Sequence, residues 1–158
     1  MRLIVCVDDG MGMMFNKRRQ SKDARVREDM LAMLPEGKKL FVTPYTARQF
    51  LPEEQERLGV LTEEVSTGII FKQGELPEMG ERLDKATLPE AGAFFFAEDT
   101  DVTGLEQAAE QVVLYRWNRA YPSDVKFTFD LSGYEMISCE DFVGNSHPEM
   151  KKEVYRRR

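Results

Sequence analysis

Several carboxylates in this sequence have positions that could support chemistry. Asp23 lies near the start of a predicted helix, where it could hydrogen-bond the N–H groups of a heterocycle or relay a proton. We take it as the candidate catalytic residue, although an aspartate in a first helical turn also stabilises the helix by itself. Asp8 and Asp9 precede Gly10 at the end of a predicted strand, where they could bind a ligand hydroxyl group or a cation, or simply begin a turn.

A second group combines positive charge with aromatic rings. Arg18 and Arg19 lie in the first predicted loop, and the run Arg-Trp-Asn-Arg at 116–119 follows a predicted strand. Arginine beside an aromatic ring provides stacking as well as charge, so these segments could line a cleft for an anionic ligand. The alternative is ordinary polarity at a strand end, with Trp117 in the core. The candidate ligand-binding residues are Asp8, Asp9, Arg18, Arg19, Thr46, Tyr115, Arg116, Trp117 and Asn118.

A third, acidic group follows another predicted strand. Glu98, Asp99 and Asp101 supply the hard oxygen ligands that suit Mg²⁺. Capping of a helix by Asp101 or Thr103 is the commoner role of such residues, and we assign no metal site.

The single histidine could hold a loop or assist a nucleophile. His147 precedes a proline, and we expect it to be a loop residue with a structural hydrogen bond. A nucleophilic pair with Cys139 would need a hairpin to bring the two side chains together. The sequence contains no recognisable Ser-His-Asp motif and no Cys-x-x-Cys motif.

The elements that must position these groups begin with an unbroken apolar run. Residues 3–7 predict a strand covered on both faces, and Gly12 is expected to let the following loop adopt positive φ. Ser21 is a plausible N-cap for a helix that ends at Pro35, because Val26, Met30 and Leu34 recur at helical spacing.

Strands and helices then alternate for about two-thirds of the chain, and strands alone follow. This order predicts a single α/β domain over 1–158, with a mostly parallel sheet, helices on both faces and an antiparallel hairpin at the C-terminal end. Further strands are predicted at 39–43, 59–61, 67–71, 92–97, 112–117, 126–130 and 134–142, helices at 46–58, 76–86 and 103–111, and a last strand or short helix at 150–157.

Composition limits the classes of function. The chain has 158 residues, 42% of them hydrophobic, and a formal net charge of -6, which argues against a general nucleic-acid binder. It has no apolar run long enough to span a bilayer and no secretory signal, so we expect a cytoplasmic protein. Its two cysteines, Cys6 and Cys139, are expected to be reduced and buried. The expected partner is a small molecule, with a homodimer as a further possibility.

The order of these segments resembles dihydrofolate reductase along nearly the whole chain. Residues 4–8 with the loop containing Gly12 are similar to the first strand and mobile loop of that family, and 40–46 to its second strand and cofactor-contacting turn. Residues 109–115, 126–130 and a closing hairpin through 145–147 are similar to its C-terminal third. The resemblance implies the same fold and places Asp23 near the substrate-binding carboxylate. The positions that match the cofactor-binding residues are Thr43, Thr46, Ala97 and Glu98.

Departures from the family pattern concern the cofactor. The Gly-Gly pair that follows the fifth strand of the family is replaced here by Ala97, Glu98 and Asp99. Two carboxylates and a Cβ atom there would oppose a diphosphate by repulsion and by bulk. Pro44-Tyr45 replaces the Gly-Arg of the family, which removes a cation and a backbone donor. We therefore disfavour NADPH as a cofactor and expect Thr43, Thr46, Ala97 and Glu98 not to bind one.

A second resemblance involves the runs at 15–21 and 114–124, which look like those of small bacterial proteins labelled ribonuclease Z. A zinc nuclease of that type needs a cluster of histidines, and this chain has one histidine. The leading hypothesis is a protein that binds a small anionic or heterocyclic ligand at the strand ends. The alternatives are an atypical NADPH-dependent reductase, a protein-interaction or assembly module, and the nuclease.

Overall fold

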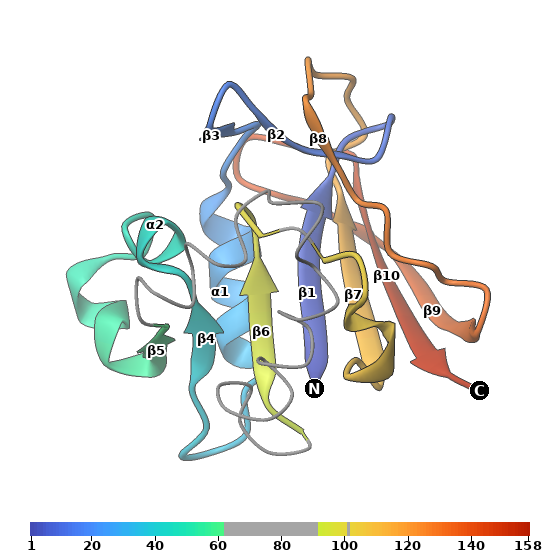
Figure 1. Cartoon of the computed structure of the whole chain (residues 1–158). Coiled ribbons are helices and arrows are strands. Elements are labelled where there is room, and N and C mark those ends of the chain that lie inside the picture. The colour runs from blue at the N-terminus through green and yellow to red at the C-terminus, as the bar shows by residue number, and fades with distance from the viewer. Residues whose placement is uncertain (62–91, 101) are drawn as a thin grey trace.

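The central sheet is built around the first apolar run of the chain (Figure 1). The computed structural model describes residues 1–61, 92–100 and 102–158. Within these ranges the sheet contains β1 (Arg2–Val7), β4 (Leu40–Val42), β5 (Leu58–Val60), β6 (Phe94–Ala97), β7 (Gln111–Arg116), β9 (Tyr134–Phe142) and β10 (Met150–Arg157). The spatial order is β5-β4-β6-β1-β7-β10-β9. The first five in sequence are mutually parallel, and β10 pairs antiparallel with β7 and β9. The mostly parallel sheet with an antiparallel C-terminal hairpin is confirmed.

A second, small sheet lies beyond the carboxyl ends of the parallel strands (Figure 1). It consists of β2 (Gly12–Phe15), β3 (Arg18–Arg19) and β8 (Val125–Lys126), in the order β3-β2-β8. The first loop of the chain is therefore tied to a segment more than a hundred residues later. This pairing fixes where the basic side chains of the loop lie relative to the sheet.

The helical segments are few among the described residues. They are α1 (Ala24–Ala32), α2 (Pro44–Ala47), and the 3₁₀ segments η1 (Pro52–Arg57) and η3 (Leu105–Gln107). The N-cap of α1 is Asp23 and not Ser21, because the Asp23 carboxylate accepts a hydrogen bond from the Arg25 backbone N–H. The continuous helix predicted at 46–58 is wrong, since the chain is extended at Leu51 and Pro52 starts a new turn.

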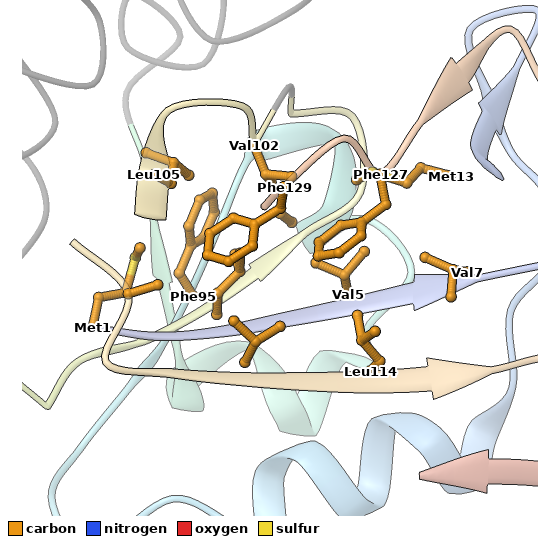
Figure 2. Close-up of a cluster of buried hydrophobic side chains, with 14 of the residues drawn as sticks. Met1, Val5, Val7, Met13, Phe95, Val102, Leu105, Leu114, Phe127 and Phe129 are labelled. Carbon is orange, nitrogen blue, oxygen red and sulfur yellow. The ribbon is translucent and has the colours of Figure 1, made fainter. Parts of the chain in front are cut away.

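Each face of the sheet has its own core. On one face α1 places Val26 and Met30 against Ile4 and Phe96. On the other face the described cover is η3, the small sheet and loops (Figure 2). There Phe127 and Phe129 stack with ring centroids 5.6 Å apart and pack in the same cluster as Val5, Phe95 and Leu114.

Two shorter predictions changed, and a third that had left two alternatives open is decided by the structure. The helix predicted at 103–111 is the three-residue η3, whose N-cap Gly104 has φ +89°. The strand predicted at 126–130 ends at Lys126, after which both phenylalanines turn into the core. Residues 150–157 form strand β10.

Gly12 has a different role from the one predicted. It lies in β2, and the positive φ angles of this loop occur at Met11, Asn16 and Lys17 instead. A Cβ atom on Gly12 would lie 2.5 Å from Gln20 Nε2 and 2.6 Å from a carbon of Ser123. Glycine is therefore required here for close approach, not for a left-handed backbone.

Some predicted elements lie outside the described residues, and the two cysteines differ from what was expected. The strand at 67–71, the helix at 76–86 and Asp101 lie outside the described residues. Both cysteines are free thiols, but Cys139 is exposed on β9 and Cys6 is only half-buried, so the expectation of two buried thiols is wrong. In the described ranges, every helix is too short or too polar to cross a membrane.

Candidate functional site

The predicted site region contains one small cavity between α1 and the carboxyl ends of β1, β6 and β7. Its volume is about 10 Å³, close to the minimum that one water molecule needs. The cavity lies at the edge of the sheet where open α/β proteins bind ligands. The side chains that line it and enter the argument below are Ser21, Asp23, Arg27, Gln49, Glu98 and Trp117.

Asp23 is buried at the start of α1 and joins it to the loop between β9 and β10. Besides the Arg25 N–H, its carboxylate accepts hydrogen bonds from the backbone N–H groups of Asn145 at 2.8 Å and Ser146 at 2.9 Å. Burial works to raise the pKa of Asp23, but these donors outweigh it and hold the pKa at about 2. A Cβ atom on Gly144 would lie 2.5 Å from Asp23 Oδ2, so only glycine fits there. The candidate catalytic carboxylate is thus ionised and anchors the loop.

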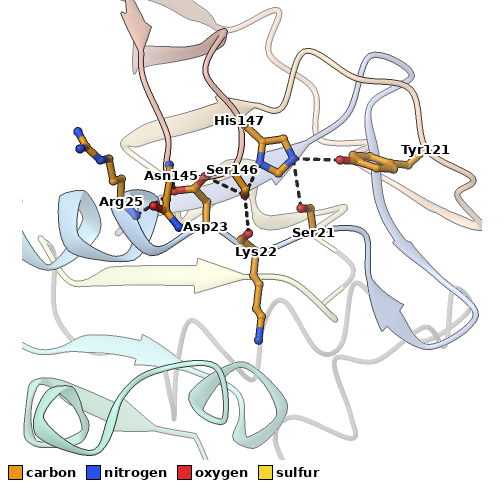
Figure 3. Close-up of polar contacts among 8 residues, drawn as sticks. All are labelled: Ser21, Lys22, Asp23, Arg25, Tyr121, Asn145, Ser146 and His147. Atoms are coloured by element: carbon orange, nitrogen blue, oxygen red, sulfur yellow. Dashed lines mark hydrogen bonds and ion pairs between the residues drawn. The ribbon is translucent and has the colours of Figure 1, made fainter.

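His147 forms the centre of a hydrogen-bonded network beside the cavity (Figure 3). It is 4% exposed. Its Nε2 atom lies 2.9 Å from the Tyr121 hydroxyl and 3.2 Å from Ser21 Oγ, while Nδ1 lies 3.0 Å from Ser146 Oγ. The ring packs on Trp117 with centroids 4.6 Å apart. The expected structural hydrogen bond is therefore present, and Cys139 is not among these partners.

The Arg19 side chain lies against Glu98, the residue that follows β6. Its guanidinium group contacts the Glu98 carboxylate through Nε at 3.0 Å and Nη2 at 3.3 Å. The same group lies over the Tyr45 ring at 4.4 Å, and the Arg19 backbone N–H donates to the Tyr45 hydroxyl. Burial raises the pKa of Glu98 despite the Arg19 charge. Arg18, in contrast, is exposed on β3 and does not share this arrangement.

Asp99 and two threonines form an adjoining buried group. Thr43 donates a hydrogen bond to Asp99 Oδ1 at 2.7 Å, and its hydroxyl group lies 3.2 Å from that of Thr46. Burial also raises the pKa of Asp99. Ala97, the preceding strand residue, is 1% exposed. The four positions that match the cofactor residues of the resembled family therefore sit in a closed, hydrogen-bonded region.

Asp8 organises the first loop. Its carboxylate accepts backbone hydrogen bonds from Gly10, Gly12 and Tyr121 at 2.6–3.0 Å, and these lower its pKa although burial opposes them. Asp9 is exposed in the turn. Neither arrangement presents a buried free carboxylate to the cavity.

The basic and aromatic run at the end of β7 does not line one side of a cleft. Tyr115 and Trp117 belong to the core on the α1 face, and Arg116 between them points to the opposite face, where it pairs with Glu153 at 2.6 Å. Asn118 is exposed with φ +58°. The prediction that 116–118 act together at one cleft is therefore wrong, because successive side chains of an extended strand alternate between faces.

Sequence reasoning missed two donors at the cavity. Arg27 Nε and Gln49 Nε2 are buried and have no hydrogen-bond partner among the described residues, although Arg27 lies 4.0 Å from Glu54. Arg27 follows Val26 on the inner half of α1, a periodicity that could have identified it. Gln49 comes from the irregular segment after α2, and no local pattern signals its position.

The fold places the chain among α/β proteins with a mostly parallel central sheet. No family model and no curated protein matches the sequence. The structure is similar to that of dihydrofolate reductase from Enterococcus faecalis complexed with NADP(H) and RAB-propyl, with a TM-score of 0.58 and 11% identity. The match covers 99% of this chain and 95% of that one. The chain has a dihydrofolate-reductase-like fold, as the resemblance of the sequence implied.

The residues at the ends of β4 and β6 do not fit a dinucleotide diphosphate. Glu98 and Asp99 are both buried there, and the Arg19 guanidinium group already forms an ion pair with Glu98. Adding phosphate groups would place further negative charge beside two carboxyl groups. We therefore derive no step through NADPH.

Metal chemistry has no evident support within the described ranges, where no group of three or more histidine, cysteine or acidic side chains could hold an ion. The nuclease alternative remains a prediction without direct support. With one histidine in the chain, the histidine cluster of a two-zinc nuclease cannot be assembled.

Proposed function

We propose that the protein binds a small anionic or heterocyclic ligand in the cleft between α1 and the carboxyl ends of β1, β6 and β7. The observation that carries the proposal is that two buried donors lining the same cavity, Arg27 Nε and Gln49 Nε2, have no hydrogen-bond partner among the described residues, and that the nearest carboxylate oxygen to Arg27 Nε, on Glu54, is 4.0 Å away. A buried donor left unpaired costs about 1–3 kcal/mol, so a ligand that supplies acceptor oxygens or ring nitrogens gains that energy on binding.

The apolar part of the cavity wall favours a flat ligand. Phe96 and Trp117 line it together with the methylene and thiol groups of Met30 and Cys6. The cavity admits only the acceptor end of such a molecule, and the rest must extend past Ser21 and Lys22, which are partly or fully exposed. An aromatic carboxylate has both required parts.

Calorimetry and thermal unfolding with aromatic carboxylates, pterins and nucleotides test this proposal. We expect at least one class to raise the melting temperature by several degrees when present well above its dissociation constant. Arg27→Met should abolish that shift, while Arg25→Met should keep it, because Arg25 is exposed on the same helix and does not line the cavity. The proposal is wrong if no class binds at millimolar concentration, or if Arg27→Met binds as the wild type does.

A second candidate function is interaction with another copy of the chain through β9. This nine-residue strand has no partner on its outer edge among the described residues, and it exposes Met136 and Ile137. Unpaired strand edges with apolar side chains favour pairing with a second strand. Sedimentation should then show a dimer that Ile137→Lys converts to monomer. A monomer at high micromolar concentration would remove this candidate.

A further inference from the structure

Beside the cavity, a hydroxyl group, an imidazole and a carboxylate come together from distant parts of the chain (Figure 3). Ser21 Oγ lies 3.2 Å from His147 Nε2, and His147 Nδ1 lies 3.5 Å from Asp23 Oδ2. These are the three group types that activate a serine nucleophile, with the difference that here Ser146 Oγ bridges Nδ1 and the carboxylate. We propose that Ser21 is a nucleophile that hydrolyses small acyl esters, with His147 as its base and Asp23 as the group that orients the histidine.

The hydrogen bonds around Nδ1 assign the proton of the histidine. Ser146 Oγ lies 3.2 Å from Asp23 Oδ2 and 3.5 Å from the Lys22 carbonyl oxygen, and because both of these can only accept, the hydroxyl hydrogen is directed to one of them and away from Nδ1. The lone pair of Ser146 Oγ, 3.0 Å from Nδ1, is then left to accept the Nδ1–H. This tautomer leaves the Nε2 lone pair facing Ser21, as a general base requires.

The ring and the carboxylate are both held in place. Trp117 packs against the imidazole, and Asp23 is fixed by backbone donors on either side, so Nε2 keeps its direction. With a pKa of about 2, the Asp23 carboxylate carries its charge throughout the neutral range and stabilises the imidazolium that forms during the reaction.

Ser21 has access that His147 lacks. The serine is partly exposed and lines the cavity, whereas the histidine is buried behind it. An acyl group can therefore approach Oγ from solvent. Arg27 and Gln49 line the same cavity, and we expect their buried Nε and Nε2 donors, which lack a hydrogen-bond partner among the described residues, to stabilise the carbonyl oxygen.

The reaction balances with water as the only co-reactant. Ser21 Oγ forms a bond to the acyl carbon while its proton passes to His147 Nε2. The ester C–O bond then breaks, and the leaving alcohol takes that proton. Water attacks the acyl-enzyme, His147 again accepts and returns a proton, and the carboxylic acid leaves with Ser21 restored.

The Tyr121 hydroxyl group offers a way to test the proposal, because it shares the Nε2 atom of His147 with Ser21. This hydroxyl group lies 2.9 Å from the Nε2 atom, closer than Ser21, and competes for the single lone pair. Removing that hydroxyl group frees the base for Ser21. If the network were only structural, Tyr121→Phe would loosen it and would not increase the reactivity of Ser21.

Labelling with a fluorophosphonate probe and hydrolysis of p-nitrophenyl acetate test the inference. We expect one phosphonyl adduct on the wild-type chain, located by peptide mass spectrometry at Ser21, and faster labelling of Tyr121→Phe. Ser21→Ala and His147→Gln should hydrolyse the ester at least about 100-fold more slowly. Ser138→Ala is the matched control, because Ser138 is equally half-buried but lies on β9, and it should behave as the wild type does.

An unlabelled Ser21 in the wild-type chain overturns the inference, and this result needs no variant to fold. Hydrolysis by Ser21→Ala at the wild-type rate also overturns it, because the histidine alone would then be responsible. Ester hydrolysis by Ser21 is a different activity from ligand binding in the cavity, and the two proposals can be refuted independently. Calorimetry with Arg27→Met reports on the binding proposal, whereas the position of the adduct reports on Ser21.

Discussion

Replacing Asp23 by asparagine should reduce stability at neutral pH and have little effect near pH 2. The substitution keeps the shape and one acceptor oxygen but removes the charge that three backbone N–H groups solvate. The pKa of about 2 lies below the ordinary value of 3.8, and at about 1.4 kcal/mol per pKa unit the difference corresponds to about 2 kcal/mol.

The sign of the pH dependence follows from the direction of the pKa change. The pKa is lowered in the folded protein, so the ionised carboxylate stabilises the fold fully above about pH 4. This contribution is lost as the pH falls from the unfolded value of 3.8 towards 2. The difference in unfolding free energy between wild type and Asp23→Asn should therefore shrink from about 2 kcal/mol at pH 7 to nearly zero at pH 2.

Urea unfolding followed by circular dichroism at several pH values between 2 and 7 provides the measurement. Taking the difference between the two chains cancels the titration of the other carboxyl groups. Asp9→Asn, on the exposed turn, is the matched control and should change stability by less than about 0.5 kcal/mol. A difference that stayed constant between pH 7 and pH 2 would refute the assignment of Asp23 as an ionised anchor.

Three further outcomes are expected. Arg19→Met leaves Glu98 without its counter-charge and should destabilise the fold by about 3 kcal/mol at pH 8. The loss should become smaller as the pH falls, because the pKa of Glu98 is raised and protonation removes the uncompensated charge. Arg18→Met should change little in the same urea titrations. Gly12→Ala should lower the unfolding free energy by about 1–3 kcal/mol, since the new Cβ atom has no room, and thermal unfolding would show this. NADPH at millimolar concentration should leave the melting temperature unchanged in scanning fluorimetry.

The strands were predictable because their apolar runs carry the signal locally. The runs at 3–7 and 94–96 are long and β-branched or aromatic, and both form interior parallel strands. The helix at 46–58 failed because polar residues with good helical propensity do not outweigh Pro52 and a weak apolar stripe. Helical propensity alone does not stabilise a short helix that buries no apolar face.

The site was predictable only in part. Asp23 could be placed at a helix start from its neighbours, but its partners Asn145 and Ser146 lie more than 120 residues away. The meeting of Ser21 with His147 depends in the same way on the register of β9, β10 and β7, which single residues do not encode. The sequence also could not show that Arg116 and Trp117 face opposite sides of the sheet.

The anchoring of Asp23 has a consequence for how the protein folds. The cap of α1 is completed by a loop that lies near the other end of the chain, so the first turn of the helix depends on a contact of very high sequence separation. The helix start and the 144–147 loop should consequently open together, and their amide protons should exchange with one common protection free energy. During synthesis, this corner of the molecule must remain unfinished until the final hairpin has emerged.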